Sequence, residues 1–118
     1  MLFRSERLQG AEFVLLRTGW SARWGREDYF RGFPCLTGEA ARWLVEHGVR
    51  GFGVDTCSVD PPDSTALPVH HALLGGQVLI VENLTNLEAL PEGSFPFLAL
   101  PLPLHDADGG PVRAVAMV

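Results

Sequence analysis

The stretch that decides the fold of this chain is PVHHALLGGQVLIVENL, residues 68–84. Residues 69–74 predict a short helix, and residues 77–82 predict a buried strand because their apolar residues run almost without interruption. The pair Gly75-Gly76 between them predicts a sharp reversal of the chain. A helix, a reversal and a strand in this order are typical of an α/β protein.

His70 in the helix and Glu82 at the end of the strand are candidate metal ligands. Imidazole nitrogen and carboxylate oxygen are groups that zinc and manganese accept. The chain reverses between them at Gly75-Gly76. The alternative is a helix-capping histidine and a strand-end carboxylate with unrelated roles. No second cluster of His, Asp and Glu precedes them, so we expect only part of a metal site.

Composition indicates one packed domain spanning residues 1–118. Hydrophobic residues make up 47% of the chain and charged residues 19%, which excludes a disordered polymer. The net charge is −5 and the nine basic residues, all arginine, are scattered, so we expect no nucleic-acid partner. We also expect no membrane segment, because no uncharged apolar run approaches roughly 18 residues. Cys35 and Cys57 form no CxxC motif, which favours the cytoplasm.

Further elements follow from capping signals and apolar runs. The clearest helix is Thr37 to His47, where Thr37 can cap the N-terminus, Glu39 suits the positive end of the dipole and Gly48 suits a left-handed C-cap. Other segments are expected to be strands: residues 12–17, 51–55, 95–104 and 112–118. Strands outnumber helices, so the prediction is a mixed α/β fold.

Asp55, Ser58 and Asp60 place two carboxylates and a hydroxyl just beyond a predicted strand. Active sites of α/β proteins often lie at such strand ends, and these residues could orient a ligand histidine. The alternative is a set of Asx and Ser turns that brace Pro61 and Pro62. Both interpretations stay open on the sequence.

An aromatic segment between residues 20 and 33 could line a pocket. Trp20 and Trp24 are the candidate substrate wall, with Tyr29, Phe30 and Phe33 close by in the sequence. The alternative is that these rings pack the segment against the sheet.

Six short pieces of the sequence occur in an order that resembles one known family. They are Arg17-Thr18-Gly19-Trp20, Gly53-Val54-Asp55-Thr56-Cys57-Ser58-Val59-Asp60, His70 with Leu73-Leu74, Val81-Glu82-Asn83-Leu84-Thr85-Asn86-Leu87, Leu100-Pro101-Leu102 and Asp108-Gly109-Gly110-Pro111-Val112-Arg113-Ala114. This order resembles the C-terminal part of the Putative cyclase family, which includes bacterial kynurenine formamidases and isatin hydrolases.

The resemblance implies a swivelling β/β/α fold and a metal-dependent hydrolase of C–N bonds in amides. Members resembling this chain hydrolyse N-formylkynurenine in tryptophan catabolism or open cyclic amides, use zinc or manganese, and form dimers or larger oligomers. By position, His70 and Glu82 match two metal ligands of the family. Together with the reversal at Gly75-Gly76, this match predicts that the two side chains converge on one pocket.

The chain also departs from the family pattern. The other ligands and the acid/base histidine lie in an N-terminal motif, His-x-Gly-Thr-His-x-Asp-x-Pro, that has no match here. We therefore expect a shortened family member that is inactive alone, with no catalytic residue of its own. Two alternatives are a non-catalytic subunit or scaffold that keeps the fold for association, and an enzyme completed in trans by another chain. A homodimer is expected in each case, with a small-molecule amide as substrate only if the site is completed.

Overall fold

The structure is a computed structural model that describes residue 8 and residues 10–118. It divides into two compact units, Met1–Glu88 and Ala89–Val118. The first contains a three-stranded sheet and the second a two-stranded sheet. The expectation of a single domain over residues 1–118 stays a prediction.

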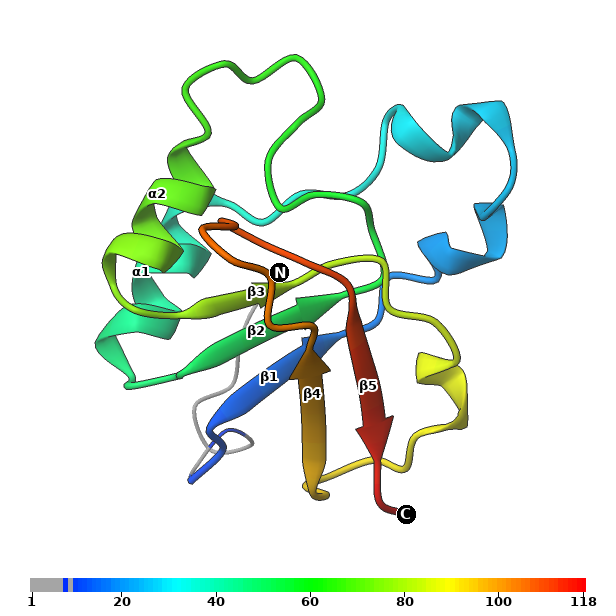
Figure 1. The fold of residues 1–118 in the computed structure, drawn as a ribbon, viewed down its shortest axis with the longest axis vertical. Coiled ribbons are helices and arrows are strands. Elements are labelled where there is room, and N and C mark those ends of the chain that lie inside the picture. Colours follow the sequence, from blue (N-terminus) through cyan, green and yellow to red (C-terminus); the bar gives the residue numbers. More distant parts are fainter. Residues whose placement is uncertain (1–7, 9) are drawn as a thin grey trace. The chain divides into compact units, whose positions relative to one another are not determined.

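The sheet of the first unit is parallel, with strand order β1-β2-β3 (Figure 1). β1 spans Phe13–Leu16, β2 spans Gly51–Val54 and β3 spans Leu79–Val81. Parallel neighbours need a crossover connection, and a helix supplies each: α1, Gly38–Glu46, and α2, Pro68–Gly75. The α/β class is confirmed, and the strands and helices lie where the sequence predicts them.

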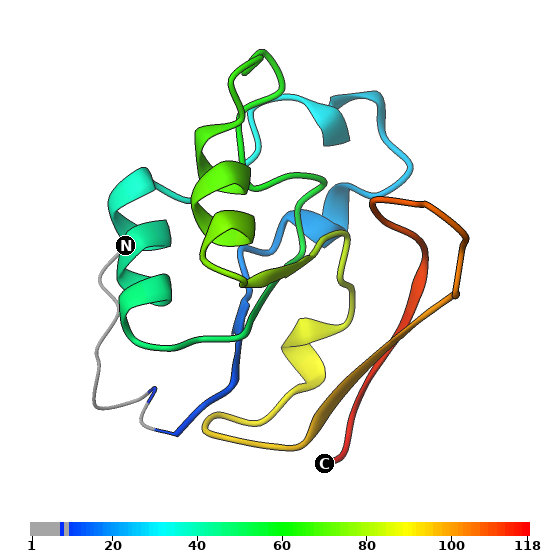
Figure 2. The same cartoon turned by 60° about the vertical axis from the view of Figure 1, so that its left-hand side comes forward.

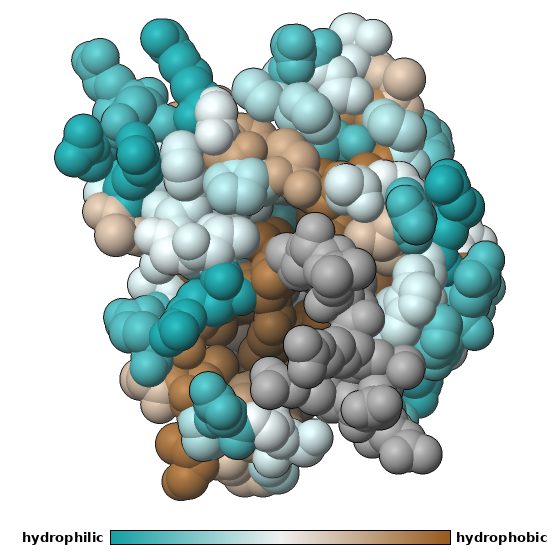
Figure 3. All heavy atoms as spheres, turned by 180° about the vertical axis from the view of Figure 1, so that it is seen from behind, coloured by the Kyte–Doolittle hydropathy of each residue, from teal (hydrophilic) through white to brown (hydrophobic). Residues whose placement is uncertain are grey.

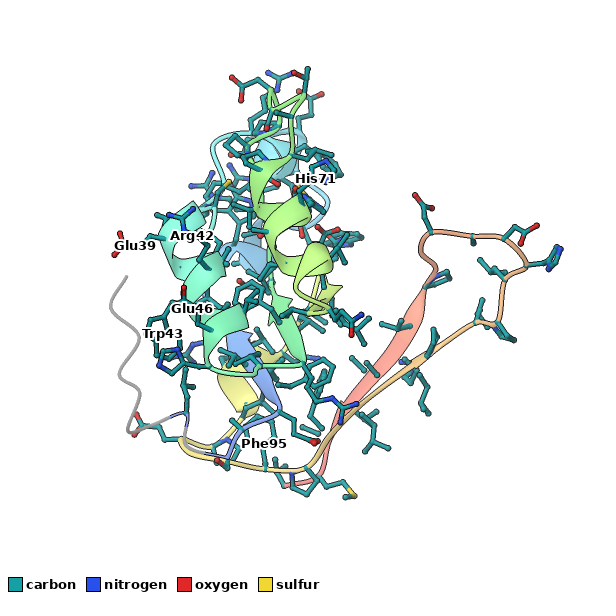
Figure 4. All side chains as sticks on the ribbon, turned by 90° about the vertical axis from the view of Figure 1, so that its left-hand side faces the viewer. Glu39, Arg42, Trp43, Glu46, His71 and Phe95 are labelled. Atoms are coloured by element: carbon teal, nitrogen blue, oxygen red, sulfur yellow. The ribbon has the colours of Figure 1, made fainter. Side chains whose placement is uncertain are left out.

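The first helix begins and ends as its capping residues predict. Thr37 Oγ1 accepts a hydrogen bond from the Ala40 N–H at 3.1 Å, and Gly48 has a φ of +72° just beyond the helix. Leu44 is fully buried on the inner side of the helix. Charged side chains, including Glu39 and Arg42, lie along its outer side (Figure 4).

The central strand, β2, is buried along its whole length. It lies between β1 and β3, and its side chains alternate between the two faces of the sheet. Phe52 and Val54 belong to the core cluster. The strand's glycines alternate with them and therefore face the opposite side of the sheet. A Cβ atom on Gly53 would lie 2.6 Å from Leu15 Cδ2 and 2.8 Å from Leu84 Cδ1. Glycine thus leaves room for neighbouring side chains to lie over the strand.

The two helices pack against each other on one face of the sheet (Figure 2). Their contact depends on Gly76, where a Cβ atom would lie 2.5 Å from Val45 Cγ2. The buried core below them includes Phe52 at 0% and Leu73 at 0% exposure. Burying a side chain of this size stabilises the fold by about 1.5–3 kcal/mol.

The reversal after α2 is made differently from the sequence-based expectation. Gly76 has an ordinary negative φ of −86°, and the left-handed residue is Gln77, with a φ of +60°. The Gln77 N–H bonds to Leu74 O at 3.0 Å, and the Val78 N–H bonds to Leu73 O at 2.8 Å. These two bonds form a Schellman motif, which satisfies the last carbonyl groups of the helix. Gly76 is therefore needed for packing rather than for the turn.

The predicted burial of the strand over residues 77–82 is only partly right. Val78 and Val81 are buried, but Leu79 is 62% exposed. β3 pairs with β2 on one side only, so it lies at the edge of its sheet. The continuous apolar run did not distinguish an edge strand from a central one.

The second unit is an antiparallel pair, β4 at Phe97–Pro101 and β5 at Val112–Ala116. Leu98 and Val115 are directly paired and are 40% and 42% exposed. Other large apolar residues of this unit are also exposed: Leu100, Leu102, Leu104, Val112, Met117 and Val118. Apolar side chains reach the surface in the view of Figure 3, where brown atoms lie between hydrophilic ones. An isolated two-stranded pair is marginally stable in water. The exposed apolar side chains of this unit would therefore be stabilised by packing against other protein atoms.

Helices of the described residues are all too short or too polar to cross a membrane.

Two adjacent glycines test the contact between α1 and α2. We expect Gly76→Ala to lower the free energy of unfolding by about 1–3 kcal/mol, because the new methyl group overlaps Val45. Gly75→Ala is the matched control: no atom lies within 4 Å of its Cβ position, and alanine favours a helix. Urea unfolding checks both. Equal stability of the two variants would contradict the proposed packing.

Candidate metal-binding site

Polar residues meet at the carboxyl ends of the three parallel strands. Because the strands run in one direction, the residues that follow each of them come together at one edge of the sheet. Backbone bonds hold these segments in place: the Asn83 N–H donates to Thr56 O at 2.8 Å and the Leu84 N–H to Val54 O at 3.0 Å. Glu82 is thereby joined to the loop that carries Asp60.

Asp60 caps the second helix from a distance in the sequence. Its carboxylate is fully buried, and it accepts hydrogen bonds from the Val69 N–H at 3.0 Å and the His70 N–H at 2.9 Å. The N-terminus of a helix has unpaired N–H groups and partial positive charge, both of which favour a carboxylate. The residue preceding the helix, Leu67, provides no side-chain cap, so Asp60 takes that role.

The same carboxylate orients the ring of His70. Asp60 Oδ2 lies 2.7 Å from His70 Nδ1. Burial alone would raise the pKa of Asp60, but the hydrogen bonds from His70 and Val69 outweigh it, and the pKa lies below its usual value. An ionised carboxylate only accepts hydrogen bonds, so Nδ1 carries the proton. In the neutral ring the free lone pair is therefore on Nε2.

Glu82 faces that lone pair. His70 Nε2 and Glu82 Oε1 are 3.3 Å apart, so the structure brings the two predicted residues together. Oε1 is buried and has no hydrogen-bond partner among the described residues. Burial raises the pKa of Glu82, and the nearby His70 ring and Val59 backbone amide offset only part of that rise.

This arrangement fits two ligands of one cation. A lone pair and a carboxylate oxygen repel each other unless a proton or a metal ion lies between them. Two ligands that are each about 2.0–2.2 Å from one tetrahedral zinc ion are about 3.4 Å apart, and the observed separation is 3.3 Å. A carboxylate bonded to the far nitrogen of a ligand histidine is a common feature of zinc sites. Within residue 8 and residues 10–118, however, no group of three or more His, Cys, Asp or Glu side chains could hold a metal.

Asp55 and Ser58 brace the backbone around this site. Asp55 is fully buried and accepts hydrogen bonds from the Thr18 N–H, the Thr18 hydroxyl and the Gly19 N–H at 2.9, 2.6 and 2.8 Å. Ser58 Oγ accepts from the Asp60 N–H at 3.2 Å, which is a local serine turn. Of the three residues predicted here, Asp60 alone contacts the candidate ligand His70.

The two candidate wall residues differ in their surroundings. Trp20 is partly buried and donates its Nε1–H to Tyr29 O at 2.8 Å. Trp24 is 68% exposed and packs edge-on against the Tyr29 ring at a centroid distance of 5.2 Å. Phe30, 60% exposed, packs edge-on against the same ring at 5.1 Å. Trp24 and Phe30 are therefore free to contact another molecule, whereas Trp20 is held within the loop.

One residue near the site was not anticipated. Asn83 follows Glu82 in a left-handed conformation, with a φ of +58°, and its Oδ1 accepts the Tyr29 hydroxyl proton at 2.8 Å. The signal in the sequence is an asparagine directly after a strand, because asparagine tolerates positive φ better than most residues.

Comparison with known proteins assigns the chain to a family. The Putative cyclase family matches residues 2–61. The chain belongs to this family. Its cyclase-family relatives include a kynurenine formamidase of Bacillus cereus, which is 44% identical over 108 residues; the match covers 92% of this chain and 50% of that protein.

Solved structures of cyclase-family proteins share the fold. Isatin hydrolase A from Labrenzia aggregata has a TM-score of 0.80 at 36% identity, over 90% of this chain and 45% of that one. A predicted metal-dependent hydrolase from Bacillus stearothermophilus has a TM-score of 0.73 at 33% identity, over 88% and 48%. The chain thus spans about half the length of the relatives it matches. The expected fold and the resemblance to the family's metal-dependent hydrolases are confirmed.

The role of Asp60 predicts an acid-dependent loss of stability. Because its folded pKa is lowered, Asp60 stabilises the fold at pH values above its unfolded value of 3.8, and this contribution is lost as the pH falls through the lowered value. We expect Asp60→Asn to cost about 1.5–3 kcal/mol at pH 7, and the difference from wild type to shrink below about pH 3.8.

The exposed Asp63 provides the control. Asp63→Asn removes an exposed carboxylate from the same loop and should change the free energy of unfolding at pH 7 by less than about 0.5 kcal/mol. Chemical denaturation between pH 2.5 and pH 7 measures all three proteins. A difference between Asp60→Asn and wild type that is constant across this range would contradict the assignment of an ionised Asp60.

Proposed function

We propose that this chain supplies part of the active centre of a metal-dependent hydrolase, with His70 and Glu82 as two ligands of a divalent cation. The observation that carries the proposal is the buried Glu82 Oε1, which has no hydrogen-bond partner among the described residues and lies 3.3 Å from His70 Nε2. Keeping a buried carboxylate oxygen without a hydrogen bond costs stability, and a cation between Oε1 and Nε2 would remove that cost. Zinc and manganese both accept this donor pair.

Asp60, His70 and Glu82 would have different roles in such a site. Asp60 keeps the proton on His70 Nδ1 and so directs the Nε2 lone pair toward Glu82. The burial of Glu82 strengthens its attraction for a positive charge, since electrostatic interactions increase when water is excluded. A divalent cation, when bound, would polarise a scissile carbonyl and lower the pKa of an attacking water.

We propose a formamide or cyclic amide with an aromatic ring as the substrate class. Relatives bear the names kynurenine formamidase and isatin hydrolase. The exposed rings of Trp24 and Phe30 support an aromatic substrate, because ring faces pack well against one another. Two free cysteines, Cys35 and Cys57, support a location in the reducing cytoplasm.

We further propose that the chain does not hydrolyse such amides alone. The described residues contain no third ligand near His70 and Glu82. The remaining ligands and the group that protonates the leaving nitrogen would come from another polypeptide segment, which makes completion in trans one form of this proposal.

A second candidate function is a non-catalytic subunit that associates through its fold. The exposed apolar residues of the second unit, such as Leu100 at 59% and Met117 at 59%, favour association. A homodimer is the simplest assembly, and light scattering at twice the chain mass of 12.9 kDa would support it. Failure to bind a divalent metal would favour this second function over the first.

The metal site predicts opposite effects of one substitution with and without metal. The raised pKa of Glu82 means that its charged form opposes folding at pH values above that raised value. We therefore expect Glu82→Gln to raise the free energy of unfolding by about 1 kcal/mol at pH 7 in EDTA. In zinc at ten times its Kd, wild type should gain about 1.4 kcal/mol and Glu82→Gln should gain nothing.

Glu88→Gln, at an exposed carboxylate, is the control and should behave like wild type in both conditions. Thermal unfolding with and without zinc gives the comparison. Equal stabilisation of wild type and Glu82→Gln by zinc would show that the metal binds elsewhere.

We expect hydrolysis of N-formylkynurenine only when this chain is combined with a second polypeptide that supplies the missing groups. With N-formylkynurenine and zinc or manganese, the chain alone should show no turnover above that of His70→Ala, because removing groups that act as a unit costs several orders of magnitude in rate. Co-expression with the unmatched half of the Bacillus cereus kynurenine formamidase should produce hydrolysis that His70→Ala abolishes. Turnover by the chain alone that disappears in His70→Ala would contradict the proposed need for a second segment.

A further inference from the structure

Tyr29 is a buried residue for which the proposed metal site has no role so far. It is 1% exposed, yet it comes from a surface loop rich in charged residues. A buried tyrosine hydroxyl must find hydrogen-bond partners, and this one has a short bond to Asn83 Oδ1 at 2.8 Å and a longer one to Asp55 O at 3.5 Å. Both partners follow strand ends at the edge of the sheet that carries His70 and Glu82.

Asn83 controls the direction of the chain directly after Glu82. Its φ of +58° lies in the left-handed region. Asparagine tolerates this region better than most residues, but it still prefers a negative φ, so other contacts are needed to keep it there. Two contacts hold it here. The Asn83 N–H donates to Thr56 O at 2.8 Å, and its side chain accepts from Tyr29.

The orientation of Glu82 therefore depends on a bond made by its neighbour. If the Tyr29 hydroxyl is removed, Asn83 keeps only its backbone bond and is free to leave the left-handed region. The chain direction after Glu82 would then change, and with it the position of the carboxylate. The Val59 backbone amide also bonds to the Glu82 carboxylate, but Oε1 itself has no hydrogen-bond partner among the described residues. The position of Oε1 opposite His70 therefore depends on the chain direction set at Asn83.

We infer that Tyr29 is a positioning residue, which holds Glu82 opposite His70 through the side chain of Asn83. This inference rests on the proposed metal-binding function. It also links the aromatic loop to the metal site, because Tyr29 packs against both Trp24 and Phe30. A molecule that displaces those rings would act on the position of Glu82 through Tyr29.

The test uses the whole chain and removes one hydroxyl group. Tyr29→Phe keeps the ring and loses the bond to Asn83, and Asn83→Gly loses the same bond while still tolerating positive φ. Thr18→Val is the control. It removes two hydrogen bonds of the same loop, one that the Thr18 hydroxyl donates to Asp55 and one that it accepts from the Trp20 N–H, and it removes none made by Asn83. NMR three-bond couplings report the side-chain rotamer of Glu82, and Mn²⁺-induced broadening of the His70 ring signals reports metal affinity.

We expect wild type and Thr18→Val to keep one Glu82 rotamer, and Tyr29→Phe and Asn83→Gly to show averaged couplings. Tyr29→Phe and Asn83→Gly should each bind Mn²⁺ about tenfold more weakly than wild type. This is the lower end of the effect, about 10- to 100-fold, seen for residues that orient metal ligands. The double variant should bind no more weakly than either single one, because both break the same link.

One result would overturn the role of Tyr29, and a different one would overturn the proposed metal site. A single Glu82 rotamer in Tyr29→Phe, with only the loss of thermal stability seen in Thr18→Val, would mean that Tyr29 merely packs, and the inference would be wrong. An absence of Mn²⁺ broadening in wild type would remove the proposed metal site. The rotamer measurement in metal-free protein would still decide whether Tyr29 positions Glu82.

Discussion

The buried carboxylate of Asp60 is the interaction on which the rest of the site depends. It receives hydrogen bonds from the Val69 N–H, the His70 N–H and the His70 ring. One charged group thus completes the N-terminus of α2, fixes that helix to the loop after β2 and selects the protonated nitrogen of the histidine. Each bond is strong because the acceptor is ionised and shielded from water. Helix position and ring orientation cannot change independently of each other.

Glu82 represents the opposite situation, a partly buried carboxylate whose inner oxygen, Oε1, has no hydrogen-bond partner in the described part of the chain. Its pKa is raised by burial, whereas that of Asp60 is lowered by its hydrogen bonds. The two carboxylates on either side of the His70 ring therefore differ: the surroundings of Asp60 favour its charged form, and those of Glu82 disfavour its charged form. Asp60 serves the fold, and Glu82 is kept at a cost to the fold. Such local costs are expected at sites kept for binding rather than for stability.

Membership of the cyclase family and the partial site are consistent with each other. The chain covers about half of its relatives, and it brings together two donor atoms of the kind that a metal centre needs. The aromatic loop and the metal-binding edge are also parts of one structure, because Tyr29 connects them by a hydrogen bond. The proposed substrate wall and the proposed metal ligands are thus connected within the described residues.

Much of the architecture was readable from the sequence alone because it depends on local physical chemistry. Thr37 and Gly48 marked the ends of α1. The reversal at Gly75-Gly76, together with the ligand positions that the family resemblance implies, predicted that His70 and Glu82 meet. Tertiary structure decided what depends on neighbours distant in the sequence. It made β2 the central strand and left Leu79 exposed at an edge, since strand order follows from pairing and not from apolar content. It placed the left-handed turn at Gln77 and gave Gly76 a packing role instead, because Val45 leaves no space for a Cβ atom at residue 76. It also chose between the two interpretations of Asp60, since a carboxylate in a loop becomes a helix cap only when the helix is folded against it.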